Sequence, residues 1–245
     1  MIQKSKAVVL KTVEFKETSL IATLFTQKHG KIAVIAKGAR RPKNKFAAFL
    51  VPGQMLEVLY YYKQSRSVQT LSEVSYIKQL SELRYDIDKM ALSTITMELV
   101  SQLIHDNEVN EPVFEFLIRF LPWLNERKDV SRKIFPYVQI RLAQLIGIGL
   151  QAQIQTSDQV QSGFINIQTG ELSDESSGSE SIKLNSAQFK FVNQALHSAS
   201  TSIFSLKLNN RELAELIEYL DKYFRYHIEG IRPRRSDKIF DQLIK

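Results

Sequence analysis

Residues 19–36, SLIATLFTQKHGKIAVIA, decide the fold of the first part of this chain. Two apolar segments rich in β-branched residues, 19–26 and 31–36, flank the polar stretch QKHG, where Gly30 permits a tight turn. A segment of the same character, residues 6–13 (KAVVLKTV), precedes them. These three segments predict an antiparallel three-stranded meander.

Two further strands and a short helix complete the predicted barrel. Residues 46–51 (FAAFLV) suit one or two helical turns, which Pro52 and Gly53 then end. Strands are predicted at residues 55–63 and 67–77. Three strands, a helical link and a hairpin match the small five-stranded OB-fold barrel, with an SH3-like barrel as the alternative.

Three tyrosines follow one another on the fourth predicted strand, Tyr60, Tyr61 and Tyr62. Successive strand residues point to opposite faces, so one face is core and the other is open to solvent. An exposed tyrosine can stack on nucleic-acid bases. Tyrosine is also a common strand residue that simply packs, and both interpretations stay open.

A cationic loop follows the third strand, at residues 36–46 (AKGARRPKNKF). It contains no acidic residue, and its cations are Lys37, Arg40, Arg41, Lys43 and Lys45. Gly38 allows backbone conformations closed to other residues, while Pro42 fixes its own φ and favours extended geometry before it. A loop that leaves a strand with its cations spread apart suits a row of phosphates.

Positive charge is concentrated in the first third of the chain. Residues 1–80 hold 14 Lys and Arg against 4 Asp and Glu, a net charge of +10, whereas the remainder holds 19 against 22, a net charge of −3. This asymmetry favours binding to nucleic acid or to an acidic surface over a merely solubilising role. A second basic cluster near the end of the chain either extends that surface or is solvated; it contains Arg225, Arg232, Arg234, Arg235 and Lys238.

The apolar period becomes helical from about residue 80. Helices are predicted at residues 85–105, 112–125 and 131–150, and two more at 186–199 and 210–228. Residues 151–185 between them are polar and rich in Ser, Gln and Gly, with a small hairpin expected around Gly170.

The expected fold class is therefore α+β, with an N-terminal five-stranded OB-fold barrel followed by an all-α domain that carries a small hairpin insertion. The predicted domains are residues 1–79 (barrel), 80–150 (helical), 151–185 (irregular insertion without zinc ligands) and 186–245 (C-terminal helices).

Catalytic and metal-binding motifs are absent from the sequence. There is no cysteine, and the four histidines show no HxxxH or HExxH spacing. Phosphate-loop, GxSxG and GxGxxG motifs are missing too. We expect no cofactor, no metal and no enzymatic activity. No apolar run approaches the roughly 20 residues that cross a bilayer, so the expectation is a cytoplasmic, nucleoid-associated protein.

The chain resembles the bacterial RecO family of recombination and repair proteins in three segments, VVLKT (residues 8–12), LIATLFTQKHGKIAVIAKGARRPKNKF (20–46) and LVPGQ (50–54). The ending YFRYHIEGIRPRRS (223–236) is similar to some members' tails. This resemblance implies a non-catalytic mediator that binds single- and double-stranded DNA and anneals complementary strands. It also implies work with RecR, contact with the acidic tail of the single-stranded-DNA-binding protein, and indirect assistance to RecA loading.

By this resemblance the five loop cations fall where the family's DNA-contacting loop lies, and Lys31, on the strand before the loop, is included with them. Family members with a cysteine zinc site carry it in the region that matches residues 151–172, which here has no cysteine. Two alternatives stay open: an RNA-binding or ribosome-associated barrel protein, and an adaptor whose loop meets an acidic protein.

Overall fold

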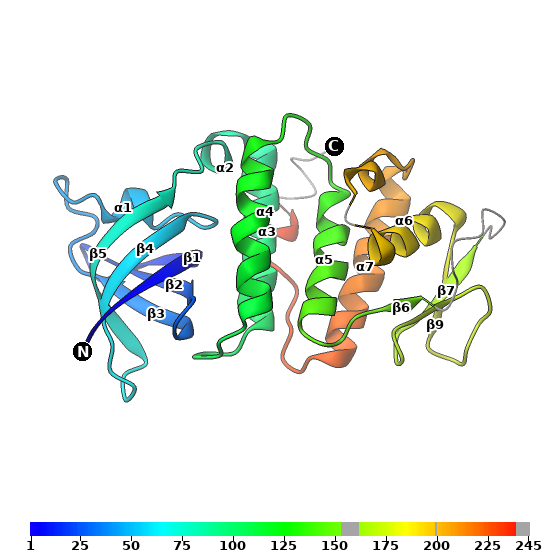
Figure 1. Cartoon of the computed structure of the whole chain (residues 1–245), viewed down its shortest axis with the longest axis horizontal. Coiled ribbons are helices and arrows are strands. Elements are labelled where there is room, and N and C mark those ends of the chain that lie inside the picture. Colours follow the sequence, from blue (N-terminus) through cyan, green and yellow to red (C-terminus); the bar gives the residue numbers. More distant parts are fainter. Residues whose placement is uncertain (153–161, 199, 239–245) are drawn as a thin grey trace. The chain divides into compact units, whose positions relative to one another are not determined.

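The computed structural model describes residues 1–152, 162–198 and 200–238 (Figure 1). These residues form two compact units. Unit 1 comprises Met1–Val130 and the C-terminal segment, residues 234–238; unit 2 comprises the described part of Ser131–Pro233. The predicted boundaries at residues 79, 150 and 185 do not coincide with this division, because the first helices pack on the barrel.

Five strands of unit 1 close into a barrel in the order β1-β2-β3-β5-β4, with β1 pairing with β4. All neighbours are antiparallel except β3 and β5. The helix α1 lies between β3 and β4, which is the OB-fold arrangement and not that of an SH3-like barrel. The strands are β1 (Ile2–Phe15), β2 (Ser19–Thr26), β3 (Gly30–Ala36), β4 (Met55–Tyr61) and β5 (Val68–Lys78), and α1 is Phe46–Phe49.

The long strand β1 allows the barrel to close. Its first half pairs with β4 and its second half with β2, and a register shift between Val9 and Lys11 marks an irregularity where the strand passes from one partner to the other. Such irregularities bend a strand and increase its twist, as closure requires. Inward-facing side chains from all five strands then fill the barrel, including Val9, Leu24, Val34, Val58 and Leu71.

The helices α3 (Ile87–Leu103) and α4 (Glu111–Glu126) belong to unit 1 because they cover the barrel. The rings of Phe25 in β2 and Phe114 in α4 meet edge to face at 5.6 Å. The segment between the two helices lies against the start of β3, where the amide of Asn107 donates to the carbonyl of Lys31 (2.8 Å). A Cβ atom on Gly30 would lie 1.8 Å from the carbonyl oxygen of Glu108. Only glycine fits this contact.

The predicted helix at residues 85–105 is two helices, α2 (Glu82–Tyr85) and α3. The chain is extended at Asp86, whose side chain accepts hydrogen bonds from the amides of Asp88 and Lys89. Asp86 is thus the N-cap of α3, and a cap requires non-helical backbone at that position.

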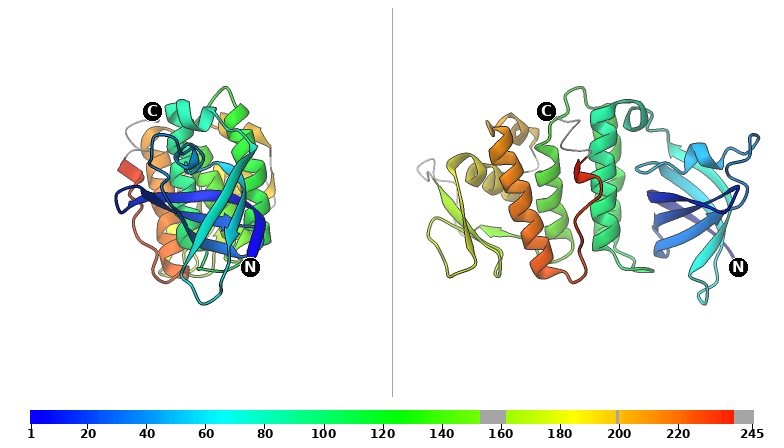
Figure 2. Two further views of the ribbon diagram at one scale, coloured as in Figure 1. Left: turned by 90° about the vertical axis from the view of Figure 1, so that its left-hand side faces the viewer. Right: turned by 180° about the vertical axis from the view of Figure 1, so that it is seen from behind.

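The C-terminal segment, residues 234–238, runs beside α3, as the red ribbon in the right-hand view of Figure 2 shows. The carboxylate of Glu98 accepts hydrogen bonds from the amides of Arg235 and Ser236 (both 2.9 Å) and from the hydroxyl of Ser236 (2.6 Å). Three donors on one carboxylate fix the segment to the helix.

In unit 2 the helices α5 (Ile134–Leu145), α6 (Ser186–His197) and α7 (Asn210–His227) pack together. The hydroxyl of Tyr223 in α7 donates to the carbonyl of Ile148 (2.6 Å), just beyond α5. Asn209 and Glu212 form a capping box at the start of α7, as predicted, and Asn185 and Gln188 form one at the start of α6. A short 3-10 helix, Thr201–Ser205, lies between these two helices.

The segment expected to hold a small hairpin contributes four strands to one sheet, in the order β6-β8-β7-β9. The strands are β6 (Gln151–Ala152), β7 (Gly163–Asn166), β8 (Glu171–Ser173) and β9 (Ser181–Leu184). The ring nitrogen Nε2 of His227 in α7 hydrogen-bonds the carbonyl of Ile167 (2.9 Å) after β7. Contacts with α6 and α7 therefore support these short strands, of which β7 and β8 pair antiparallel on either side of Gly170.

Candidate nucleic-acid interface

The basic loop, residues 37–45, connects β3 to α1 at one end of the barrel. In its middle, Ala39 is 1% exposed and belongs to the barrel core. The amide of Arg40 donates to the carbonyl of Thr18 in the β1–β2 turn (2.9 Å). The loop is therefore attached to the barrel halfway along its length.

Two successive turns fix the rest of the loop backbone. Gly38 has a φ of +67°, and its carbonyl accepts a hydrogen bond from the amide of Arg41 (3.0 Å). The carbonyl of Arg41 then accepts from the amide of Asn44 (2.9 Å). The side-chain oxygen of Asn44 accepts from the amide of Phe46 (2.8 Å) at the start of α1. These local bonds hold the loop in one conformation without any help from its cationic side chains.

All five loop cations are exposed, as predicted. Only Arg40 has an ionic partner within the described residues: its Nη1 lies 2.8 Å from Oε2 of Glu14 at the end of β1. Within the same ranges no ion pair involves the other four, which are Lys37, Arg41, Lys43 and Lys45. Four unpaired cations and one paired cation thus project from a fixed backbone.

Lys31 lies apart from these cations, at the opposite end of β3. Its side chain is 13% exposed, and its Nζ donates to the carbonyl of Ser101 (2.8 Å) and lies 3.2 Å from Oδ1 of Asp106. The structure therefore gives Lys31 a contact between the barrel and α3. The alternation of apolar residues along β3 could not predict this contact, because Ser101 lies 70 residues away from Lys31 in the sequence.

The β1–β2 turn beside the loop was not included in the predicted site. It presents Lys16, which has a φ of +52° and an ammonium group 5.5 Å from the ring centre of Phe15. Glu14 and Thr18 contact the loop directly. In the sequence, the only sign of this turn is the stretch EFKE at residues 14–17, with three charged residues, which is also typical of an ordinary strand end.

Of the three consecutive tyrosines, which lie at and just beyond the end of β4, only Tyr61 is well exposed. Tyr60 is fully buried, and its hydroxyl lies 2.6 Å from Nδ1 of His29. The ring of His29 stacks on Tyr62 at 3.9 Å, so one face of that ring is occupied. Burial lowers the pKa of His29, and Lys28 lowers it further. Tyr61 points outward and is 47% exposed.

The second basic cluster is divided between the two units. Arg225 is exposed on α7 of unit 2. Arg234 belongs to unit 1, is 8% exposed and pairs through Nε with Oδ1 of Asp237 (2.8 Å). Arg225 and Arg234 thus belong to different units.

Comparison with known proteins identifies the family. Residues 1–80 match the family model described as "Recombination protein O N terminal", and residues 84–237 match "Recombination protein O C terminal". The chain belongs to the RecO family. The N-terminal RecO model covers the whole barrel with its basic loop, whereas the C-terminal model includes helices of both units.

Similar RecO proteins are known from several bacteria. A DNA repair protein RecO of Salinibacter ruber is 41% identical over 147 residues, which cover 60% of this chain and 56% of that protein. One of Chloroherpeton thalassium is 29% identical over the full length of both chains, and one of Exiguobacterium is 27% identical over 100% of this chain and 98% of the relative. These relatives are consistent with a role in DNA repair.

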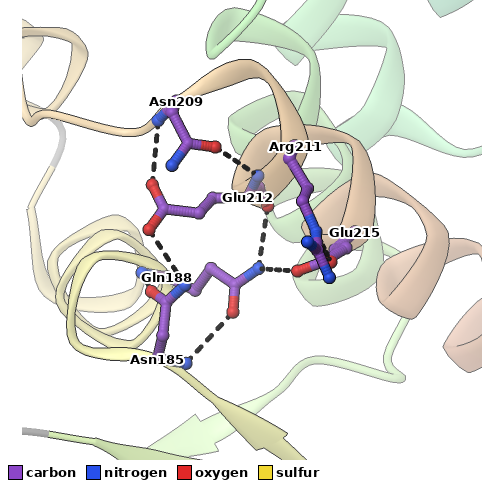
Figure 3. Close-up of polar contacts among 6 residues, drawn as sticks. All are labelled: Asn185, Gln188, Asn209, Arg211, Glu212 and Glu215. Carbon is purple, nitrogen blue, oxygen red and sulfur yellow. Dashed lines mark hydrogen bonds and ion pairs between the residues drawn. The ribbon is translucent and has the colours of Figure 1, made fainter.

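Unit 2 of this RecO family member contains a cavity of about 410 Å³. Beside it the capping boxes of α6 and α7 meet (Figure 3). The carboxylate of Glu212 accepts from the amide of Asn209 (2.8 Å) and from Nδ2 of Asn185 (3.1 Å), and Nε2 of Gln188 donates to the carbonyl of Glu212 (2.8 Å). Each helix start thus stabilises the other. The cavity is lined by Asn185, Ser186, Ala187, Lys190, Leu206, Lys207 and Glu212.

In the described ranges, no group of three or more His, Cys, Asp and Glu side chains is placed to hold a metal ion. Over the same part of the chain, no helix has the length and hydropathy needed to cross a membrane.

Proposed function

We propose that this RecO family protein binds single- and double-stranded DNA through its basic loop and anneals complementary strands. In this proposal it acts as a non-catalytic recombination mediator in the nucleoid. The observation that carries the proposal is the group of four unpaired cations on a backbone that its own hydrogen bonds hold in place.

Annealing through such a loop needs no bond-making step. Lys and Arg side chains neutralise phosphates without reading the bases, so their contribution is independent of sequence and weakens as salt rises. Two strands whose repulsion is reduced can approach, and base pairing then determines the direction of the reaction. Tyr60 is buried and Tyr62 stacks on His29, so we expect any base stacking here to involve only Tyr61 of the three tyrosines, which is 47% exposed.

The proposal extends to partners on the basis of family membership. We infer that the protein works with RecR, contacts the acidic tail of the single-stranded-DNA-binding protein, and assists RecA loading indirectly. No described residue is assigned to these contacts.

The test is annealing of two complementary fluorescent oligonucleotides coated with the single-stranded-DNA-binding protein, at two salt concentrations. We expect acceleration that fades as salt rises. The double variant Arg41→Ala/Lys43→Ala should anneal more slowly, and its plot of log affinity against log salt for single-stranded DNA should be shallower by about 1.4, or 0.7 for each lost contact.

The matched control is Lys63→Ala/Arg66→Ala, which removes two exposed cations from the β4–β5 turn. The strand register places this turn at the opposite end of the barrel from the basic loop. Equal losses in the two double variants would show that only total charge matters. No annealing by the folded wild-type protein would leave the adaptor interpretation.

A further inference from the structure

Glu14 places a negative charge against the surface that is proposed to bind a polyanion. Its carboxylate contacts the guanidinium of Arg40, the second of the five cations of the basic loop, at 2.8 Å. The nearby acid Glu17, in the β1–β2 turn, has no ion pair within the described ranges. An acid at this position repels phosphates and would therefore weaken the binding of DNA to the loop.

The ion pair is not what shapes the loop. The burial of Ala39, the hydrogen bond from the amide of Arg40 to Thr18, and the two turns around Arg41 all hold the backbone independently. The side chains of Glu14 and Arg40 are 71% and 38% exposed. Pairs as exposed as this contribute little to stability and are screened by salt.

A phosphate is a strong competitor for the Arg40 guanidinium. Guanidinium groups bind phosphate oxygens through two parallel hydrogen bonds, and a nucleic acid presents such groups in a continuous row. The pair is open to solvent, so an approaching strand can reach Arg40 without any change in the loop backbone.

We propose that Glu14 is an internal counter-ion: it holds the Arg40 side chain in the free protein and gives it up to a phosphate when DNA binds. This inference rests on the proposed function. It makes Glu14 a residue that limits DNA affinity, which favours release of the annealed product. Arg40 then contacts DNA only after exchanging one anion for another, unlike Lys37, Arg41, Lys43 and Lys45.

The test measures single-stranded DNA affinity at low ionic strength for Glu14→Gln and for the matched control Glu17→Gln. Both variants remove one negative charge from the end of β1 or the turn that follows it, but only the first releases Arg40. We expect Glu14→Gln to bind roughly two- to fivefold more tightly than Glu17→Gln, the range typical of one exposed ion pair. The advantage should shrink as salt rises.

The same two substitutions in an Arg40→Ala background complete the test. The gain from Glu14→Gln should fall there to that of Glu17→Gln, because no guanidinium remains to be released. An undiminished gain, or weaker binding by Glu14→Gln with its melting temperature unchanged, would overturn the counter-ion role while leaving the proposed function intact. Absence of DNA binding by the wild-type protein would overturn both.

Discussion

Lys31 and Lys37 show how environment separates two residues of the same type. They lie six positions apart, one near the start of β3 and one just beyond its end. The Lys31 ammonium is directed at a carbonyl of α3, whereas the Lys37 ammonium is exposed. We therefore expect Lys31 to contribute less to DNA binding than Lys37.

Substitution of methionine for each lysine should therefore affect different properties: Lys31→Met the stability of the fold, and Lys37→Met the binding of DNA. Lys31→Met is expected to lower the free energy of unfolding by about 1 to 3 kcal/mol, because the carbonyl of Ser101 loses a charged donor. Its DNA affinity should keep the wild-type salt dependence. Lys37→Met should leave stability unchanged and reduce the salt slope. Urea unfolding and salt titrations of DNA binding measure the two quantities, and identical behaviour of both variants would contradict this assignment.

Gly30 provides a second test at the residue scale. Gly30→Ala combines a positive φ of +63° with a Cβ atom 1.8 Å from the carbonyl oxygen of Glu108, so a loss of several kcal/mol is expected. The control is Gly147→Ala, where φ is +86° and no atom lies within 4 Å of the new Cβ. This substitution carries only backbone strain, of about 1 to 2 kcal/mol. Similar losses in the two variants would show that Glu108 moves aside.

At the scale of elements, Glu98 ties the C-terminal segment to α3. Burial by itself would raise the pKa of this carboxyl, but the hydrogen bonds from Ser236 and from the amides of residues 235 and 236, with the charge of Arg234, outweigh it and hold the pKa below the usual value of 4.5. The folded state therefore favours the ionised carboxylate.

The sign of the resulting pH dependence follows from this lowered pKa. A carboxyl whose pKa is lower in the folded state stabilises the fold above the unfolded value and loses that contribution as pH falls through the folded value. The difference in melting temperature between wild type and Glu98→Gln should be constant near neutral pH and shrink below about pH 4.5. A difference that persists to lower pH would exclude the charge of Glu98 as the cause.

At the scale of the whole molecule, the barrel depends on the helices that follow it. Phe25 is fully buried and contacts Phe114 in α4, and the start of β3 contacts the segment between α3 and α4. A fragment ending at residue 80 exposes this surface. We expect fragment 1–80 to melt at a lower temperature than fragment 1–130 and to bind a hydrophobic dye more strongly. Equal melting temperatures would mean that the barrel is an independent domain.

The sequence by itself determined the features that are encoded locally. Alternation of apolar residues predicted the five strands, the run at residues 37–45 predicted an exposed cationic loop, and Asn209 with Glu212 predicted a helix start. Each depends on residues only a few positions apart, whose geometry the strand period and turn chemistry dictate.

Only the tertiary structure shows which charged side chains have ionic or hydrogen-bond partners, and where the boundary between the two units lies. Lys31 meets Ser101 at a separation of 70 residues, and Glu98 meets Ser236 at a separation of 138. Arg40, in the loop after β3, likewise meets Glu14 at the end of β1. No local pattern predicts such contacts, because only the folding of α3, the barrel and the C-terminal segment onto one another brings these residues together.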